Sequence, residues 1–292
     1  MTSDSPAVPL SVRVMLGHAA VQRVADLHAV DILHLKGFAL DDTVSWAGRV
    51  GSDVDVLVRP DHVGRFLDAL SASGWNLSIG FEAGSPFGHA ATLLHDVWGY
   101  VDVHRLYPGI TVSPAAAFDI LWGERGESEI AGARCPVPSL AGQAVILVLH
   151  AARSEDKARG LRDVDAAWGR ATPQQRQGIT ELVGRLGAEV ALAAAVGNLD
   201  EFQDRPDHDL WKVVSQGGTR IEEWWARIKA APTVGDSIRL VLRAPLVNVE
   251  HLAVVLGRTP TRWEVVQEFF ARPLRGLREE WRVRHDPSGG SR

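Results

Sequence analysis

The stretch GRVGSDVDVLVRPD, at residues 48–61, places two aspartates at alternate positions within a run of valine and leucine. Side chains two residues apart in a strand project to the same face, so the sequence predicts a strand over about residues 52–58 with Asp53 and Asp55 on one face. Two neighbouring carboxylates repel each other, and a divalent cation between them removes that cost. Taken alone, the pattern favours a solvated strand edge, and the flanking segments decide whether it forms a metal site.

The segments around this strand alternate between the apolar spacing of helices and that of strands. Helices are expected at residues 8–29, 38–48 and 62–73, and Gly74 marks the end of the last one. Strands are expected at residues 32–35, 52–58, 75–80, 89–96 and 99–106. The fold class that follows is α+β, with a small mixed sheet and flanking helices.

The character of the sequence changes near residue 138. Residues 128–138 are expected to form a hairpin, and the sequence is helix-like from Ser139 to about Val283. We therefore expect a mixed domain at residues 1–138, a helical domain at residues 139–285 and a disordered tail at residues 286–292.

Composition excludes several classes of protein. The formal net charge of -5 leaves no excess of cations for a phosphate backbone, so bulk binding of nucleic acid is not expected. A single cysteine, Cys135, excludes an internal disulfide and any multi-cysteine metal site. The N-terminus lacks the features of a signal peptide, and no apolar run reaches the roughly 18 residues that span a membrane. We expect a cytoplasmic protein without a membrane partner.

Two further segments carry polar side chains that are expected near the acids. Lys36 and Gly37, in the sequence LKG, lie at a predicted turn from strand to helix, where free backbone N–H groups favour phosphate. The sequence YVDVH repeats the alternation, so Asp102 and His104 share one face of another apolar strand. Three acids and a lysine-glycine turn together favour a metal and phosphate site.

These residues support a family resemblance. The sequence LHLKGFAL, then Arg49, then SDVDVLVRPD, a helix ending in SGW, and finally VDVH resembles the nucleotidyltransferase superfamily, most closely an uncharacterised bacterial branch. The resemblance covers about residues 30–106, and LAGQAVILVLHAAR and LRDVDAAW are more weakly similar to the helices that follow in that branch. One departure is that Phe38 follows Gly37, where the superfamily usually has glycine or serine. The resemblance implies a nucleotidyltransferase-like sheet followed by a helical region that binds the acceptor or closes as a lid.

The resemblance also implies a reaction and assigns residues to it. In this superfamily an acceptor hydroxyl attacks the α-phosphorus of a metal-bound NTP, and pyrophosphate leaves. The implied ligands of Mg²⁺ or Mn²⁺ are Asp53 and Asp55, and Asp102 is the third acid, which binds the metal or receives the acceptor's proton. The residues expected at the nucleotide are Lys36, Gly37, Arg49 and Ser52, and those expected beside the acceptor or behind the metal ligands are His104 and His150.

Several of these side chains have a purely structural alternative. Lys36 is otherwise a solvated lysine at a turn, and Arg49 otherwise pairs with Asp42 or another surface acid. His104 and His150 are otherwise packed histidines.

Two other functions are weighed against the enzyme. The first is a binding protein on the same fold that senses a nucleotide or serves a partner without turnover, which the altered glycine motif favours and the intact acids oppose. The second is nucleotide transfer to the 3′ end of tRNA, which needs a basic face that the net charge does not indicate. The preferred hypothesis is an enzyme that uses an NTP and an unknown small-molecule, peptide or protein acceptor.

Overall fold

The structure is a computed structural model that describes residues 8–81, 87–218 and 220–230, together with Thr261 and Trp263. The expected helices beyond residue 230 and the expected tail at residues 286–292 lie outside these residues. The chain divides into two compact units, residues 1–192 and 193–292. The change to helical structure comes where the sequence indicates it, because Ser139 caps the helix α4 (Leu140–Ala152), but the first compact unit continues to residue 192.

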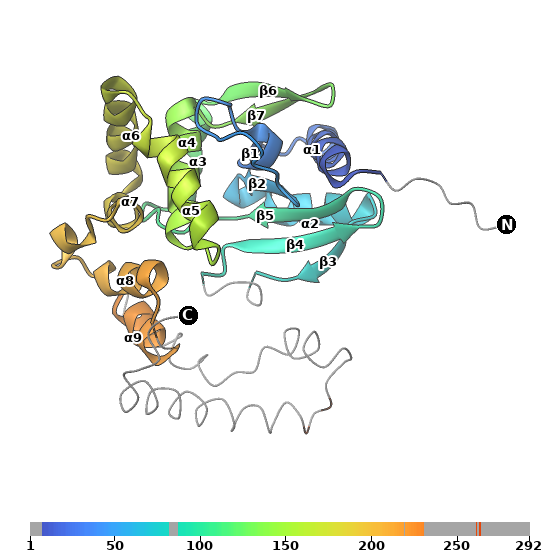
Figure 1. Ribbon diagram of the computed structural model, residues 1–292. Coiled ribbons are helices and arrows are strands. Elements are labelled where there is room, and N and C mark those ends of the chain that lie inside the picture. The colour runs from blue at the N-terminus through green and yellow to red at the C-terminus, as the bar shows by residue number, and fades with distance from the viewer. Residues whose placement is uncertain (1–7, 82–86, 219, 231–260, 262, 264–292) are drawn as a thin grey trace. The chain divides into compact units, whose positions relative to one another are not determined.

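The first unit contains a five-stranded mixed sheet (Figure 1). The strand order is β1-β2-β5-β4-β3, in which β2 and β5 are parallel and the other neighbours are antiparallel. The strands are β1 (Ile32–His34), β2 (Val54–Val58), β3 (Asn76–Ile79), β4 (Ala90–His95) and β5 (Gly99–His104). The predicted α+β class and all five predicted strands are confirmed.

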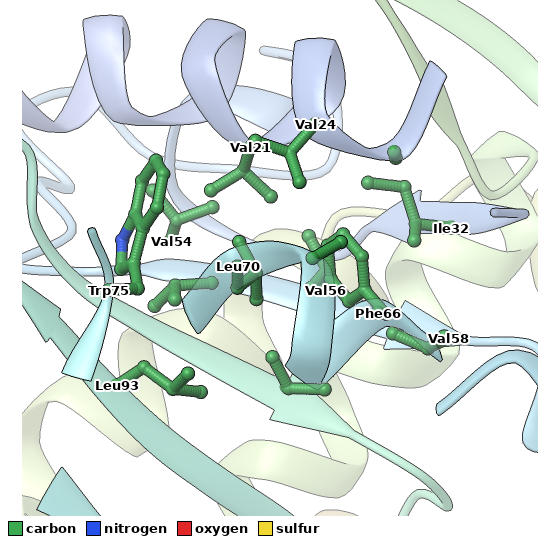
Figure 2. Close-up of a cluster of buried hydrophobic side chains, with 14 of the residues drawn as sticks. Val21, Val24, Ile32, Val54, Val56, Val58, Phe66, Leu70, Trp75 and Leu93 are labelled. Carbon is green, nitrogen blue, oxygen red and sulfur yellow. The ribbon is translucent and has the colours of Figure 1, made fainter. Parts of the chain in front are cut away.

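One face of the sheet carries the main hydrophobic core of this unit (Figure 2). Helix α1 (Leu10–Leu27) contributes Val21 and Val24, and helix α2 (Val63–Ala72) contributes Phe66 and Leu70. These side chains pack on the even-numbered valines of β2, which are Val54, Val56 and Val58. The odd-numbered residues of β2 therefore project to the opposite face.

The opposite face lies near α4. The hydroxyl of Tyr107 donates a hydrogen bond to the carbonyl of Ile146 in this helix at 3.0 Å. The remaining elements of the unit are α3 (Pro114–Gly123), the hairpin β6 (Gly126–Ile130) and β7 (Ala133–Val137), α5 (Lys157–Val164), a π-helical turn at Asp165–Gly169, α6 (Pro173–Leu186) and α7 (Glu189–Val196), the last of which runs into the second unit. The predicted hairpin is confirmed, and Ala131 and Gly132 turn it with positive φ.

The prediction of a helix at residues 38–48 is wrong. Gly37–Ala39 forms a single 3₁₀ turn, and the chain then continues without a longer helix to β2. The Asp41 carboxylate accepts hydrogen bonds from the backbone N–H and the hydroxyl of Thr43 at 2.8 and 2.6 Å. The Asp41 N–H donates to the side chain of Gln143 at 2.7 Å, so local and tertiary bonds replace helical ones.

In the second unit, the described helices are α8 (His208–Gln216) and α9 (Arg220–Ala230), preceded by a 3₁₀ turn at Leu199–Phe202. Lys229 of α9 forms an ion pair with Asp209 of α8 at 2.6 Å. Within the described ranges of the whole chain, every helix is too short or too polar to cross a lipid bilayer.

Candidate active site

The site is built on the two parallel strands at the centre of the sheet. The register sets Asp55 of β2 directly beside Asp102 of β5, on the face opposite the main core. Asp53 lies one residue before β2, so it belongs to the turn that leads into the strand and not to the strand itself. The alternation predicted that Asp53 and Asp55 share the face of one strand, whereas β2 begins two residues later than predicted and does not include Asp53.

Asp55 forms a buried ion pair. Its Oδ1 atom accepts hydrogen bonds from Lys36 Nζ at 2.8 Å and from His104 Nε2 at 2.9 Å. Burial alone would raise the pKa of Asp55, but the Lys36 ammonium and the His104 hydrogen bond hold that pKa far below its ordinary range. The carboxylate is therefore ionised, and among the described residues none donates a hydrogen bond to its Oδ2 atom.

The hydrogen bond from His104 fixes the state of the imidazole. Burial, although opposed by Asp55, lowers the pKa of His104. A neutral ring that donates through Nε2 carries a free electron pair on Nδ1. This Nδ1 atom is buried, and within the described part of the chain it has no hydrogen-bond partner.

Asp102 completes a set of donor atoms that suits a divalent metal ion. One atom from each of Asp55, Asp102 and His104 lies within 4.8 Å of the others. Two carboxylates match the preference of Mg²⁺ and Mn²⁺ for oxygen ligands, so the residues fit the metal that the superfamily implies. Asp53 is not part of this set.

The lysine-glycine turn lies against the chain that leads into β2. Gly37 has a φ of +64°, a conformation that favours glycine, and a Cβ atom on Gly51 would come within 3.3 Å of the Gly37 Cα. Next to this contact, the Ser52 hydroxyl donates to Asp53 at 3.3 Å. Burial and the negative charge of Asp55 raise the pKa of Asp53. The two glycines allow a close approach of one backbone segment to the other. The role of Gly51 in this contact was not predicted from the sequence.

A buried polar chain supports the other side of this turn. His18 and His34 share a hydrogen bond between their Nδ1 atoms at 2.8 Å, and His34 Nε2 lies 3.0 Å from the side-chain amide oxygen of Gln22. His18 Nε2 is buried and lies 3.6 Å from the place where a Cβ on Gly37 would be. No local pattern in the sequence indicates this network, because its members lie on an apolar helix and an apolar strand.

Arg49 lies in a buried ion pair away from the acids. Its guanidinium donates to both carboxylate oxygens of Asp163 in α5, at 2.8 and 3.2 Å, and the Trp46 indole N–H donates to the same carboxylate at 2.8 Å. The two charged side chains are 2% and 1% exposed. The partners predicted for Arg49 were a nucleotide phosphate or a surface acid, whereas its partner in the structure is the buried carboxylate of Asp163.

The end of α4 brings further nitrogen groups toward the ion pair. Burial and then the positive charges of Lys36 and Arg153 lower the pKa of His150 to about 2. His89, which precedes β4, lies 5.3 Å from His104 between ring centroids. Near Asp53, the positive charge of Arg159 opposes the effect of burial, which raises the pKa of that acid. The sequence analysis missed His89, Arg153 and Arg159.

Replacing Asp102 with asparagine should stabilise the metal-free protein at neutral pH. Burial and the charge of Asp55 raise the pKa of Asp102 from 3.8 to about 6, although the Thr92 hydroxyl donates to it at 2.6 Å. A raised pKa favours the protonated acid in the folded state, so the stability that it contributes is present below pH 4 and is lost as the pH rises through 6. The Asp102→Asn variant should therefore exceed the wild type in free energy of unfolding at pH 8 by about 2 kcal/mol.

Urea unfolding in EDTA at pH 5 and pH 8 measures this difference. The gain should shrink toward pH 5, and the exposed Asp96→Asn variant in the turn before β5 serves as the control. An Asp102→Asn variant that is no more stable than the wild type at pH 8 contradicts the raised pKa.

A family model described as "Uncharacterised nucleotidyltransferase" matches residues 16–203, a range that includes every residue placed in the site. No curated protein matches the chain.

Solved structures with similarity to the chain include a lincomycin-bound lincosamide antibiotic adenylyltransferase, LnuA, at 16% identity and a TM-score of 0.34 over 57% of this chain and 94% of that one. A nucleotidyltransferase-like antigen from Paracoccidioides brasiliensis has 18% identity and a TM-score of 0.37 over 64% and 95%. ANT(2″)-Ia with adenylyl-2″-tobramycin has 14% identity and a TM-score of 0.36 over 65% and 98%. The family match, which covers more than half of the chain, is the one that decides membership: the protein belongs to the uncharacterised nucleotidyltransferase family.

Proposed function

We propose that this protein transfers an NMP from a metal-bound NTP to a hydroxyl group of a small-molecule, peptide or protein acceptor. The observation that carries the proposal is the register of β2 and β5, which sets Asp55 beside Asp102 with His104 in reach of both. Family membership supports the same reaction class.

The acids supply the metal site in this proposal. Asp55 and Asp102 would hold Mg²⁺ or Mn²⁺, with His104 bonded to Asp55 behind them and Asp53 beside them as a further acid at the entry to β2. When bound, a divalent ion lowers the negative charge on the attacking and leaving oxygens. Asp102 would either ligate this ion or receive the acceptor's proton, the two roles open to a carboxylate at this position.

The phosphates would bind at the end of the site that carries Gly37. The positive φ of Gly37 and its close contact with the buried Gly51 set the path of this backbone, and Gly37 itself is half-buried. Lys36 and Arg159 supply positive charge, and Lys36 is already held at the acids by Asp55. The chain's own contribution is thus to position the phosphates and to balance their charge.

A transfer assay tests this proposal. Purified protein is incubated with each of the four NTPs, labelled at the α-phosphate, with Mg²⁺ or Mn²⁺ and fractions of small molecules, peptides and proteins as acceptors. We expect label on one acceptor class and release of pyrophosphate, both lost in Asp102→Asn and retained in Asp96→Asn. The absence of nucleotide binding and of transfer with every NTP would overturn the proposal.

A nucleotide-sensing protein without turnover is the second candidate. Phe38 occupies the position after Gly37, and the Asp55 oxygen Oδ1 is already shared by Lys36 and His104. Calorimetry separates the two functions, because an enzyme of this class should bind NTP more tightly with Mg²⁺ than in EDTA. Tight binding that is insensitive to the metal favours the sensor.

A further inference from the structure

The C-terminal end of α4 carries an arginine without an acidic partner. Arg153 is half-buried, and its guanidinium carbon lies 5.5 Å from the centroid of the Tyr107 ring. Its Nε atom is buried without a hydrogen-bond partner among the described residues, and no acid in that part of the chain lies within 4.0 Å of it. Arg49, by comparison, binds both oxygens of a buried carboxylate. A guanidinium in this setting lacks the anion that would balance it.

Two histidines with unused nitrogen atoms lie in the same neighbourhood. His150 precedes Arg153 by three residues in α4, a spacing that places both on one side of the helix. His89 contacts the His104 ring, and His104 in turn lies 5.7 Å from Tyr107 between ring centroids. The Nδ1 atoms of His89 and His150 are buried and have no partner within the described ranges. Because each such atom costs about 1–3 kcal/mol when it stays unpaired, their concentration indicates a ligand.

The charge around these nitrogen atoms favours an anion. Burial, then His104, Arg153 and Lys36, lower the pKa of His89 to about 2, and burial with Lys36 and Arg153 does the same for His150. An imidazole donates a hydrogen bond through a ring nitrogen that carries a proton, so the two unpartnered Nδ1 atoms can serve as donors to an anion. The nearby carboxylate, Asp55, is already bonded to Lys36 and His104.

The strand register places this group beyond the acids. Asp53 and the Gly37 turn lie at one end of β2, and Asp55 and Asp102 follow at the same level of the sheet. His104 lies two residues further along β5, opposite Leu57 and Ala90. In phosphoryl transfer the attacking and leaving oxygens lie roughly in line on opposite sides of the phosphorus. If the NTP phosphates bind at the Gly37 end, the acceptor approaches from the His104 end.

We infer that Arg153, His150 and His89 form an anion subsite that binds a phosphate or carboxylate group of the acceptor. This inference rests on the proposed function, and it narrows the acceptor to a molecule that carries both a hydroxyl and an anionic group. Arg153 supplies the charge, and the two histidines supply directional hydrogen bonds.

Calorimetry with inorganic phosphate and with acetate as probes tests the subsite in the full-length protein. Each probe is titrated with and without saturating Mg²⁺ and a non-hydrolysable NTP analogue. We expect at least one probe to bind while the analogue is bound, phosphate if the acceptor is a phosphate ester and acetate if it is a carboxylate. The Arg153→Gln variant should weaken that binding by about tenfold or more, since it loses a charge-assisted hydrogen bond, and should leave the affinity for the analogue unchanged.

A matched variant, a charge-conserving variant and a folding control make the outcome decisive. Arg159→Gln, which removes a positive charge near Asp53, should weaken binding of the NTP analogue and leave binding of the probe unchanged. Arg153→Lys keeps the charge and should retain part of the probe binding, and thermal unfolding shows whether each variant is folded. Competition between probe and analogue, or equal probe binding by wild type and Arg153→Gln, would overturn the subsite. Probe binding by a protein that binds no NTP would instead overturn the proposed function and leave the anion subsite standing.

Discussion

The Asp55→Asn variant should lose nucleotidyl transfer by about 100-fold or more and should also lose about 3–5 kcal/mol in free energy of unfolding. Both effects come from one carboxylate, because Asp55 belongs to the metal donor set and also neutralises the buried Lys36. An asparagine of the same shape leaves the ammonium group buried without a counter-charge. Denaturant unfolding in EDTA and the transfer assay measure the two losses.

A second variant separates stability from activity at this position. Replacing Lys36 and Asp55 together by methionine and leucine removes both charges, and apolar replacements of a buried ion pair are often close to neutral in stability. The double variant should therefore recover most of the lost stability and none of the activity. An Asp55→Asn variant as stable as the wild type would show that the ion pair contributes little to the fold.

The Asp102→Asn variant is expected to gain free energy of unfolding, whereas the Asp55→Asn variant is expected to lose it. Asp55 and Asp102 are neighbours in the sheet, yet only Asp55 has a cation at hydrogen-bond distance among the described residues. One acid therefore stabilises the metal-free fold, and the other destabilises it above its pKa. Both are expected to be needed for transfer.

Breaking the Arg49–Asp163 pair should produce the second large effect. The Arg49→Met variant leaves the Asp163 carboxylate buried with, among the described residues, only the Trp46 indole as a partner, and we expect a loss of about 3–5 kcal/mol in free energy of unfolding. The affinity for NTP, measured where the variant is still folded, should change little. A variant with wild-type stability and weakened NTP binding would instead indicate that Arg49 binds the NTP phosphates.

A double-mutant cycle measures the coupling between these two residues. In Arg49→Met with Asp163→Asn, the amide oxygen still accepts from Trp46 while no unpaired charge remains. The double variant should be more stable than the sum of the single losses predicts, by about 1–3 kcal/mol. Strict additivity would mean that the pair is not energetically coupled.

The sequence indicated the strands of the site better than the partners of its side chains. Alternating acids and valines predict strand faces, and the family resemblance implies Asp53, Asp55 and Asp102 at one end of a sheet. In the structure the register of β2 and β5 sets Asp55 beside Asp102. The partner of Arg49 lies 114 positions away, and no local pattern connects the two. Asp53 was placed within the strand because the alternation continues through it, whereas β2 begins only at Val54.

Arg153 illustrates a different limit. A basic residue just after a helix is explained locally by the helix dipole, so the sequence offers no reason to assign it to a binding site. Only the fold shows that this helix ends near Tyr107 and His104, and that an acidic partner is lacking within the described residues. The roles of Gly51 and His89 likewise depend on backbone and ring contacts that the sequence does not encode locally.

The division of the site between a sheet and a helix has a consequence for how such a protein diversifies. Asp55 and Asp102 lie on β2 and β5, two interior strands of the five-stranded sheet, each of which pairs with a strand on both sides. Arg153 and His150 lie at the end of a single helix, outside the hydrogen-bonded frame of the sheet. Substitutions in that helix end can therefore alter which molecule is accepted while the strands that carry the acids stay the same, so acceptor preference and transfer chemistry are free to evolve separately.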